Sequence, residues 1–506
     1  MKNCLIKLVI GSLLLISSCS KPTIEKLPNI VIIYADDMGY GDLNCQNPNS
    51  KIPTPNLDRL ANEGMRFTDA HSSSGICSPS RFSLLTGVHH WRRQHGIVNS
   101  FGKPFFKDSD VTLPQILKTK NYTTACIGKW HLGWNWEFKN DPSGEVLQWQ
   151  KLRKFYKPED IEFNKPITGG PLDRGFDYYF GDGTINFPPY AWVENDRIIE
   201  TPTEVMDVHN IGFEVKEGAW EFRPGPKVKG WNPYKVLPTL TEKTVAWINR
   251  QDDKHPFFLY FALPSPHAPI IPNDEFDGKS KAGAYGDFMY QSDWVVGQVI
   301  KALKDKGFEE NTIVIFSADN GPERYAFTRA ETHDHFSMGD FRGLKRDVWE
   351  GGHHVPFIIR WPEKIDPGTV SDALISQTDM MATIANITNI ELPENAAPDS
   401  FNQLPVLLGE NTTVRTDMVH NTYEGIWGMR HGDWLYINKP TGQHTKMPES
   451  FKNLRKYEDF DTEGLLFNMK EDPEQRINLF EKHPDKVDTL KALLQQYKTD
   501  GYSVKI

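Results

Sequence analysis

The chain has 506 residues, and its 57 Lys and Arg residues against 67 Asp and Glu residues give it a net charge of −10. Charged residues make up 25% and hydrophobic residues 38% of the chain, a composition that excludes a protein disordered throughout. The acidic balance argues against a nucleic-acid-binding protein, because such proteins need a basic surface. It does not exclude an anionic substrate, since a local cluster of cations can override the charge of the whole chain.

The first 18 residues have the pattern of an export signal. Lys2 and Lys7 precede an apolar run at residues 8–16, which is too short to remain as a membrane-spanning helix, and small residues follow. Cys19 after them resembles the lipobox of bacterial lipoproteins, in which this cysteine becomes the lipidated N-terminus; plain secretion is the alternative. We expect an exported lipoprotein of the periplasm, outer membrane or cell surface, which reaches the membrane only through a lipid anchor.

Apolar, β-branched runs alternate with helical patterns from residue 28 onward. Buried strands are predicted at residues 29–35, 123–127, 256–262 and 312–318, and helices at residues 56–64 and 285–306. This alternation predicts an α/β fold with a large, mostly parallel sheet sandwiched by helices. Residues 137–230 are rich in Pro, Gly and aromatic side chains, and we expect long loops there that cover the sheet.

A second, smaller unit is predicted at the C-terminal end. Residues 392–405 are rich in Pro, Asn and Ala, which is typical of a linker. Beyond it, residues 425–430 and 434–437 are predicted to pair as strands, and residues 484–497 to form a helix that starts at a proline. We therefore predict a main α/β domain at residues 28–395 and a C-terminal α+β subdomain at residues 405–506.

Polar side chains directly follow two of the predicted strands. Asp36 and Asp37 end the first strand, and Asp319 and Asn320 end the strand at residues 312–318. The carboxyl ends of parallel strands form the edge at which open α/β sheets bind ligands. Each pair alone is typical of a helix cap or a turn. The two pairs together predict a site for a hard cation such as Ca²⁺ or Mg²⁺, which prefers oxygen ligands.

The run Cys-Ser-Pro-Ser-Arg at residues 77–81 resembles the signature of the type I sulfatases, in which the cysteine is oxidised to formylglycine. Other blocks are similar to sulfatase blocks in the same order, at residues 35–42, 54–60, 128–133, 266–269, 318–321, 342–345 and 350–352. The resemblance is to the arylsulfatase and N-acetylgalactosamine-6-sulfatase branch of the alkaline phosphatase superfamily. It implies the alkaline phosphatase-like fold, and makes residues 28–395 the catalytic domain.

The resemblance also implies roles for single residues. Ca²⁺ would be held by Asp36, Asp37, Asp319, Asn320 and the modified Cys77. As a hydrated formylglycine, Cys77 would attack the sulfur atom and expel the substrate alcohol, and Asp319 would accept the proton of the attacking hydroxyl. Maturation would then require a formylglycine-generating enzyme as a partner.

The remaining polar residues of these blocks suit an anionic ester. Arg81 and His131 would hold the formylglycine diol, and Lys129 would hold the sulfate. His267 with Lys345 would protonate or stabilise the departing oxygen. Apart from the resemblance, a sulfate ester needs cations aimed at its oxygens, and three separate blocks each supply one.

The predicted substrate is a sulfated carbohydrate, and the predicted role is degradation of sulfated polysaccharide. Residues 175–190 are similar to the corresponding part of sulfatases that act on galactose- or N-acetylgalactosamine-6-sulfate. Thr184 and Asn186 stand where relatives often have a Ser or His that contacts sulfate. His353 and His354 stand where many relatives have a residue and an Arg, which indicates either a sugar subsite or loop packing. The sequence leaves the sugar, the linkage position, exo or endo action and the oligomeric state open.

Two other functions fit parts of the sequence. Phosphomonoester or phosphonate hydrolases of the same fold with two-metal sites normally need more His and Asp ligands than we place here, and many have Thr or Ser at the position of Cys77. A sulfated-glycan-binding lipoprotein without turnover would lack catalytic groups, whereas each expected one is present. Cys45 and Cys126 remain outside these roles, and we expect two reduced, buried side chains, although the sequence does not tell whether they pair.

Overall fold

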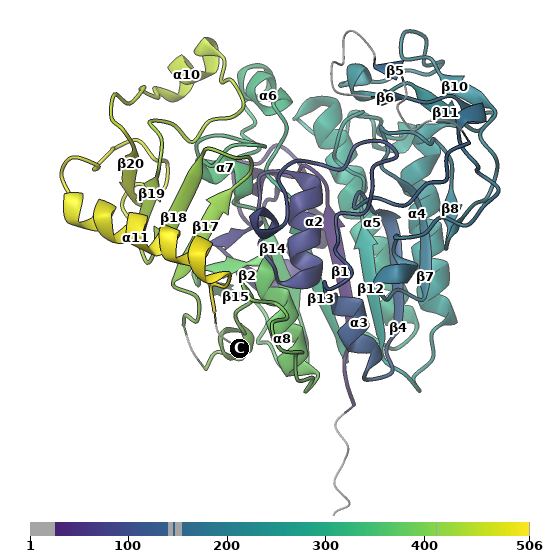
Figure 1. The fold of residues 1–506 in the computed structure, drawn as a ribbon, viewed down its shortest axis with the longest axis horizontal. Helices are drawn as coiled ribbons and strands as arrows, with labels where there is room; N and C mark the ends of the chain where they lie inside the picture. Colours follow the sequence, from purple (N-terminus) through teal and green to yellow (C-terminus); the bar gives the residue numbers. More distant parts are fainter. Residues whose placement is uncertain (1–25, 140–144, 147–153, 411, 505–506) are drawn as a thin grey trace, which may run out of the picture.

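The computed structural model describes residues 26–139, 145–146, 154–410 and 412–504, so the predicted signal at residues 1–18 lies outside the described residues. Its centre is a ten-stranded sheet in the order β15-β2-β14-β13-β1-β12-β4-β7-β8-β9 (Figure 1). The strands are β1 (Asn29–Ala35), β2 (Met65–Phe67), β4 (Thr123–Lys129), β7 (Tyr178–Gly183), β8 (Val193–Glu194), β9 (Arg197–Ile198), β12 (Phe257–Ala262), β13 (Thr312–Ala318), β14 (Phe357–Arg360) and β15 (Thr369–Ser371).

The middle of this sheet is parallel. Strand β1 pairs with β13 on one side and with β12 on the other, and β12 continues through β4 to β7, all in parallel register. Every residue of β1, β12 and β13 is buried, as expected for strands covered on both faces. Toward the edges, β14 runs antiparallel to β13, and β8 runs antiparallel to β7. The predicted α/β class is confirmed.

Helices cover both faces of the sheet because the side chains of each strand alternate between two cores. Val31 and Ile33 belong to the core under α1 (Pro55–Asn62), α4 (Val236–Arg250) and α5 (Gly283–Asp305). Ile30 and Ile32 belong to the opposite core, under α2 (Cys77–Thr86), α3 (Leu113–Lys118) and α8 (Met380–Ile387). Helix α2 packs on this second core, in front of the central strands in the view of Figure 1.

The C-terminal unit is a separate antiparallel sheet. It contains β17 (Asp417–Asn421), β18 (Trp427–His431), β19 (Trp434–Ile437) and β20 (Leu465–Asn468) in that order. Helix α11 (Pro484–Asp500) lies across it and buries Val487, Leu490 and Leu494 against the sheet. The strand pair and the closing helix expected from the sequence are both present, so the smaller α+β unit is confirmed. Helix α10 (Glu449–Arg455) lies outside this layer.

Shorter elements connect these layers. The remaining helices are α6 (Tyr325–His333), α7 (Glu350–His353) and α9 (Leu404–Leu407). The remaining strands are β3 (Ala70–His71), β5 (Glu145–Val146), β6 (Lys154–Phe155), β10 (Glu204–Met206), β11 (Gly225–Lys227) and β16 (Ile375–Ser376). Among the described residues, no helix is both long and apolar enough to cross a membrane.

Two expectations about irregular segments are wrong. The region 137–230 does not consist of loops alone, because it contains β7, whose Tyr179 pairs with Cys126 of the central sheet. The region 392–405 is not a free linker, because buried Asp399 accepts hydrogen bonds from Arg92 at 2.7 and 2.8 Å. Just beyond it, buried Arg415 donates from Nε to Asp379 at the start of α8, at 3.0 and 3.2 Å.

The cysteines agree only partly with expectation. Cys45, Cys77 and Cys126 are all free, and Cys126 is fully buried. Cys45 is only partly buried, because its segment lies at the edge of the core under α1.

Candidate active site

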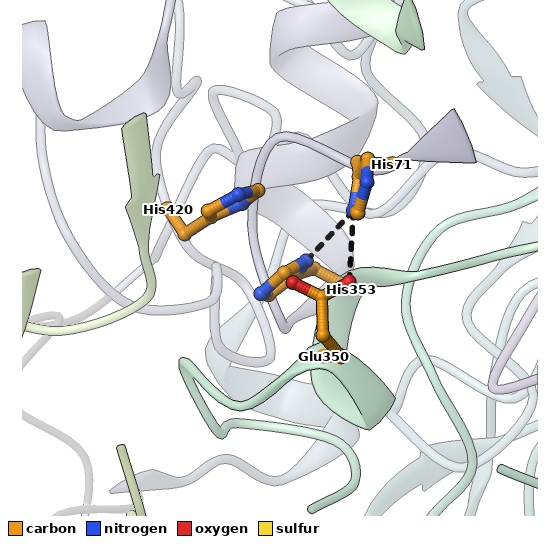
Figure 2. Close-up of side chains that lie close together, drawn as sticks. All are labelled: His71, Glu350, His353 and His420. Carbon is orange, nitrogen blue, oxygen red and sulfur yellow. Dashed lines mark hydrogen bonds and ion pairs between the residues drawn. The ribbon is translucent and has the colours of Figure 1, made fainter. Parts of the chain in front are cut away.

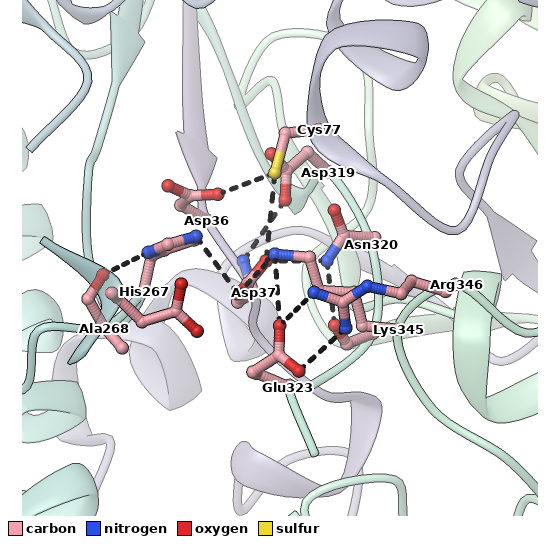
Figure 3. Close-up of polar contacts among 12 residues, drawn as sticks. Asp36, Asp37, Cys77, His267, Ala268, Asp319, Asn320, Glu323, Lys345 and Arg346 are labelled. Carbon is pink, nitrogen blue, oxygen red and sulfur yellow. Dashed lines mark hydrogen bonds and ion pairs between the residues drawn. The ribbon is translucent and has the colours of Figure 1, made fainter. Parts of the chain in front are cut away.

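The four predicted oxygen donors meet where β1 and β13 end. Ala35 pairs with Ala318 in the sheet, so the residues that follow them emerge side by side. The backbone N–H of Asp37 donates to Asp319 Oδ1 at 3.2 Å, and Asn320 Nδ2 donates to Asp37 Oδ1 at 2.8 Å. Asp36 lies beside them, and all four side chains are buried (Figure 3).

Cys77 faces this group from the first turn of α2. Its Sγ lies 3.5 Å from Asp36 Oδ1 and 3.9 Å from Asp37 Oδ1. Burial, followed by the charge of Asp319, raises the pKa of the Cys77 thiol well above its usual value. An unmodified thiol is therefore protonated here at neutral pH, and a protonated thiol is a weak nucleophile.

The donor set fits a calcium ion. Three carboxylates and one amide supply the hard oxygens that Ca²⁺ prefers. The side-chain oxygen of Asn320 is buried and has no hydrogen-bond partner among the described residues. The site is strongly acidic, and in this arrangement Lys129 and Lys345 donate to Asp36 and Asp37.

Arg81 fixes the orientation of Asp319. Its Nε and Nη2 donate to Asp319 Oδ2 at 3.0 and 2.8 Å, and both side chains are fully buried. Arg81 Nη2 also lies 3.6 Å from Asp36 Oδ1. Burial, together with the charge of Asp36, raises the pKa of Asp319 to about 6, against the influence of Arg81.

Lys345 and His267 both lie beside Asp37. Lys345 Nζ lies 2.6 Å from Asp37 Oδ1, and His267 Nε2 lies 3.6 Å from Asp37 Oδ2. Burial opposes ionisation of Asp37, but Lys345 and His267 outweigh it and hold the Asp37 pKa well below its usual range. Burial also lowers the pKa of His267 to about 4, whereas Asp37 keeps the pKa of Lys345 raised. Lys345 is therefore the protonated member of this pair at neutral pH.

Two charged residues next to Lys345 were not predicted from the sequence, Glu323 and Arg346. The carboxylate of Glu323 accepts hydrogen bonds from Arg346 at 2.7 and 2.8 Å and lies 3.6 Å from Lys345 Nζ (Figure 3). Both residues stand next to blocks that resemble sulfatase motifs. Glu323 lies two residues after Gly321, and Arg346 directly follows Lys345. Their pairing is not visible in the sequence, because it joins two loops.

His131 and Thr184 line a cavity next to this cluster. Its walls also include Trp134, Asp182 and Phe187. His131 Nε2 contacts the carbonyl oxygen of Val98 at 3.0 Å, and its Nδ1 is buried without a partner among the described residues. The backbone carbonyl of His131 accepts a hydrogen bond from Ser78, the residue after Cys77, at 2.7 Å.

Asp182 is a third residue of the site that was not predicted from the sequence. It is buried, and neither carboxylate oxygen has a hydrogen-bond partner among the described residues. Burial raises its pKa to about 7. Asn186, by contrast, is buried and is not among the residues that line this cavity, and its Nδ2 donates to the carbonyl oxygen of Glu221 at 3.3 Å.

Of the two roles left open for His353 and His354, a sugar subsite or packing, their burial supports packing. Both are almost fully buried, with 2% and 4% of their surface exposed. His354 lies 3.0 Å from Glu350 Oε2 and 2.9 Å from the carbonyl oxygen of Thr68, so its ring is used within the interior. They are residues of internal packing between α7 and the segment after β2.

Comparison with known proteins now defines the class. Residues 28–390 match the Sulfatase family, and residues 340–500 match the family described as N-sulphoglucosamine sulphohydrolase, C-terminal. The chain belongs to the sulfatase family and is a sulfuric ester hydrolase.

Individual sulfatases are similar to this chain over most of its length. The chain is 33% identical to an N-acetylgalactosamine-6-O-sulfatase of Bacteroides thetaiotaomicron over 93% of each chain. It is 31% identical to the N-acetylgalactosamine-6-sulfatase of Homo sapiens, over 75% of this chain and 66% of that one. A solved structure, from work on the metabolism of multiple glycosaminoglycans by Bacteroides thetaiotaomicron, superposes with a TM-score of 0.78 at 31% identity. It covers 94% of this chain and 100% of that one.

Proposed function

We propose that this sulfatase removes 6-O-sulfate from N-acetylgalactosamine or galactose in a sulfated glycan, with formylglycine at position 77 and Ca²⁺. The observation that carries the proposal is the position of Cys77, whose Sγ lies 3.5 Å from Asp36 in the cluster of oxygen donors. The sugar is supported by the two N-acetylgalactosamine-6-sulfatases to which the chain is similar.

Each absent group would supply one part of the chemistry. Formylglycine in its hydrated form supplies an oxygen nucleophile where the thiol of Cys77 is protonated and weak. Ca²⁺, held by the cluster of Asp36, Asp37, Asp319 and Asn320, supplies Lewis-acid activation. Asp319 is suited to accept a proton at Oδ1, because Oδ2 already accepts two hydrogen bonds from Arg81 and the pKa of about 6 lies close to neutral pH.

Side-chain cations account for the charge of the ester. Lys129 and Lys345 lie on opposite sides of the aspartate pair, one beside Asp36 and one beside Asp37. We assign Lys129 to the sulfate oxygens, and Lys345 to the sugar oxygen as it departs and gains negative charge. His267 Nδ1 donates to the carbonyl oxygen of Ala268, so its Nε2 can donate to the same oxygen only when the ring is protonated, while Arg81 and His131 hold the nucleophile.

The cavity beside His131 is proposed to receive one polar substituent of the sugar. Trp134 and Phe187 line this cavity, whose free volume of about 30 Å³ is too small for a whole pyranose ring. The unpartnered carboxyl group of Asp182 is suited to bind sugar hydroxyl groups, since a buried carboxylate without a partner is costly until a ligand satisfies it. Thr184 lines the same cavity.

Maturation and location complete the proposal. We infer a formylglycine-generating enzyme as partner, and export as a lipoprotein anchored through Cys19. The support is the residue pattern at positions 77–81 and 1–19. A phosphoester hydrolase and a binding lipoprotein without turnover are disfavoured, because the predicted site residues form one cluster in a member of the sulfatase family.

The test has two parts. First, the protein is co-expressed with a formylglycine-generating enzyme, and the peptide containing residue 77 is weighed; a loss of roughly 18 Da relative to the cysteine form is expected. Second, sulfate release is measured from N-acetylgalactosamine-6-sulfate, galactose-6-sulfate and the 4-sulfated isomers. Turnover by a Cys77→Ala variant would refute the nucleophile, and a preference for 4-sulfate would refute the linkage.

A further inference from the structure

Four buried side chains converge at a second place in the molecule, outside the catalytic cluster. They are His71 at the end of β3, Glu350 and His353 of α7, and His420 of β17 (Figure 2). Each offers one ligand atom, and these atoms all lie within 4.8 Å of one another. None of the four residues has more than 2% of its surface exposed. The group thus joins three separate segments of the chain.

The outer hydrogen bonds determine which ring nitrogens face inward. His71 Nε2 lies 2.7 Å from a carboxylate oxygen of Asp69, and His353 Nε2 lies 3.1 Å from the carbonyl oxygen of Val348. Both partners only accept hydrogen bonds, so each Nε2 carries the proton. The two Nδ1 atoms then present lone pairs to one another at a distance of 3.0 Å.

This pattern matches the support of metal-bound histidines. Such residues commonly donate their outer N–H to a carboxylate or a backbone carbonyl, which fixes the ring and turns the other nitrogen toward the metal. Here both kinds of support are present, from Asp69 for His71 and from Val348 for His353. Glu350 Oε2 lies 3.9 Å from His71 Nδ1, on the same side.

Two further atoms of the cluster lack partners. Glu350 Oε1 and His420 Nε2 are buried and make no hydrogen bond within the described part of the chain. A shared proton between His71 and His353 would relieve their contact, but it would leave both of these atoms unsatisfied. A single cation bound by all four side chains satisfies every one of them.

We propose that His71, Glu350, His353 and His420 bind a divalent transition-metal ion of the zinc class, which ties the C-terminal sheet to the catalytic domain. Imidazole nitrogens suit Zn²⁺ and not Ca²⁺, so this site is chemically distinct from the catalytic one. Four protein ligands leave no position open for substrate, which is typical of a structural zinc site.

Binding requires one side-chain movement. The ring of His420 stacks on that of His353, with centroids 3.9 Å apart and an interplanar angle of 11°. The nitrogen lone pairs of stacked rings lie in parallel planes that do not meet, so His420 has to rotate to direct a nitrogen at an ion held by the other three. An adjoining cavity lined by Asp69, Glu350 and His354 provides a route from the surface.

The position of the proposed ion determines which parts of the chain it joins. Lys345 and Arg346 lie a few residues before α7, and α7 supplies two of the four ligands. His420 belongs to the first strand of the C-terminal sheet. A metal bound here therefore fixes the C-terminal sheet against the segment that carries Lys345. The inference does not depend on the sugar or on formylglycine.

The experiment measures zinc bound to the full-length protein. An Asp319→Asn background weakens the catalytic cation site, so that retained zinc reports on the second site. Protein stripped of metal is incubated with ZnCl₂, desalted and assayed by elemental analysis, with melting temperature measured in parallel. His420→Gln and His353→Gln remove ligands, and His431→Gln changes an exposed histidine of the same sheet as the matched control.

We expect about one zinc per chain in the background and in His431→Gln, with affinity at least about tenfold weaker in the two ligand variants. Zinc is expected to raise the melting temperature only where it binds. Absence of retained zinc, or equal retention by His420→Gln, would overturn the proposal. If a ligand variant does not fold, X-ray absorption is used to measure the coordination shell of zinc in the calcium-loaded wild-type chain. A shell with imidazoles at about 2.0–2.1 Å supports the site, and a shell of sulfur or of oxygen alone refutes it.

Discussion

Arg81 holds Asp319 through two nitrogens that donate to the same carboxylate oxygen, Nε at 3.0 Å and Nη2 at 2.8 Å. The fork of an arginine makes this double contact, whereas a lysine keeps the charge but has a single nitrogen. The pair is also fully buried, so neither partner finds water as a substitute when the other is changed. The proton acceptor proposed for the reaction is therefore positioned by one side chain.

Replacing Arg81 by Lys tests this positioning. We expect kcat to fall by about 10²-fold or more, because a small misplacement of a reacting group is costly. The charge near Asp319 is retained, so a loss of this size would come from geometry. The measurement is sulfate release by the formylglycine form, with circular dichroism to verify the fold. Activity within twofold of wild type would contradict the role of Arg81.

Glu323 is expected to act on the leaving group through Lys345. In Glu323→Gln the ammonium of Lys345 loses one neighbouring carboxylate at 3.6 Å, and Arg346 loses its bidentate partner. We expect kcat/KM for a sugar sulfate to fall by about tenfold or more, and for a nitrophenyl sulfate much less, because a good leaving group needs little help. If Glu323 had a purely structural role, Glu323→Gln would lower kcat/KM for both substrates equally.

A matched control is available for this substitution. Glu217 forms an ion pair with Arg329 at 2.8 Å outside the catalytic cluster, so Glu217→Gln removes a comparable contact. We expect it to leave the ratio of the two substrates unchanged.

Asp182 links sugar binding to stability. In Asp182→Asn we expect KM for the sugar sulfate to rise by about tenfold, with little change for a nitrophenyl sulfate, because a hydroxyl group loses its charged acceptor. The folded protein is expected to become more stable, since an ionised buried carboxylate without a partner is costly. A melting temperature of Asp182→Asn below that of the wild type at pH 8 would contradict the prediction that Asp182 is buried in its charged form.

The stability gain of Asp182→Asn should depend on pH. The pKa of Asp182 is about 7 in the folded state, and the ordinary value for Asp is 3.8. Between these values the folded protein binds the extra proton, so rising pH destabilises it relative to the variant. The difference in melting temperature between variant and wild type should grow from pH 4 to pH 7 and stay constant above. A gain that is equal at pH 5 and pH 8 would show that another effect dominates.

Removing calcium should stop turnover without unfolding the protein. The acidic cluster keeps two internal cations, Lys129 at Asp36 and Lys345 at Asp37, which limit the repulsion among the carboxylates. We expect a chelator to lower activity by about 10²-fold or more, whereas the fold stays intact by circular dichroism. Added Ca²⁺ should restore the rate. A chelated enzyme with full activity would refute the metal assignment.

Much of the catalytic cluster was predictable because its residues lie in compact blocks. The strand ends at Asp36 and Asp319, and the run at residues 77–81, each combine a local pattern with a chemically distinctive side chain. The central strands β1 and β13 were equally clear, since both are continuous apolar runs. Parallel pairing then brings their ends together without further information.

Other features were hidden because they arise only on folding. Strand β7 contains two glycines and an aspartate, residues that are rare in strands, and only its pairing with β4 reveals it. Glu323 and Arg346 belong to separate loops. The four residues proposed to bind zinc lie far apart in the sequence, from position 71 to position 420, so no local motif reveals them. For His353 and His354 the sequence therefore left two roles open, a sugar subsite or packing.

The contact between Arg415 and Asp379 has a consequence for how the chain unfolds. Both side chains are fully buried, and they join the segment that leads into β17 to the first turn of α8, under the large sheet. A fragment cut at residue 405 would keep Asp379 and its neutral donors from Ser376, Phe401 and Gln403, but would lose the cation paired with it. The two sheets are therefore expected to melt together in one calorimetric transition, and the catalytic domain expressed alone is expected to be destabilised.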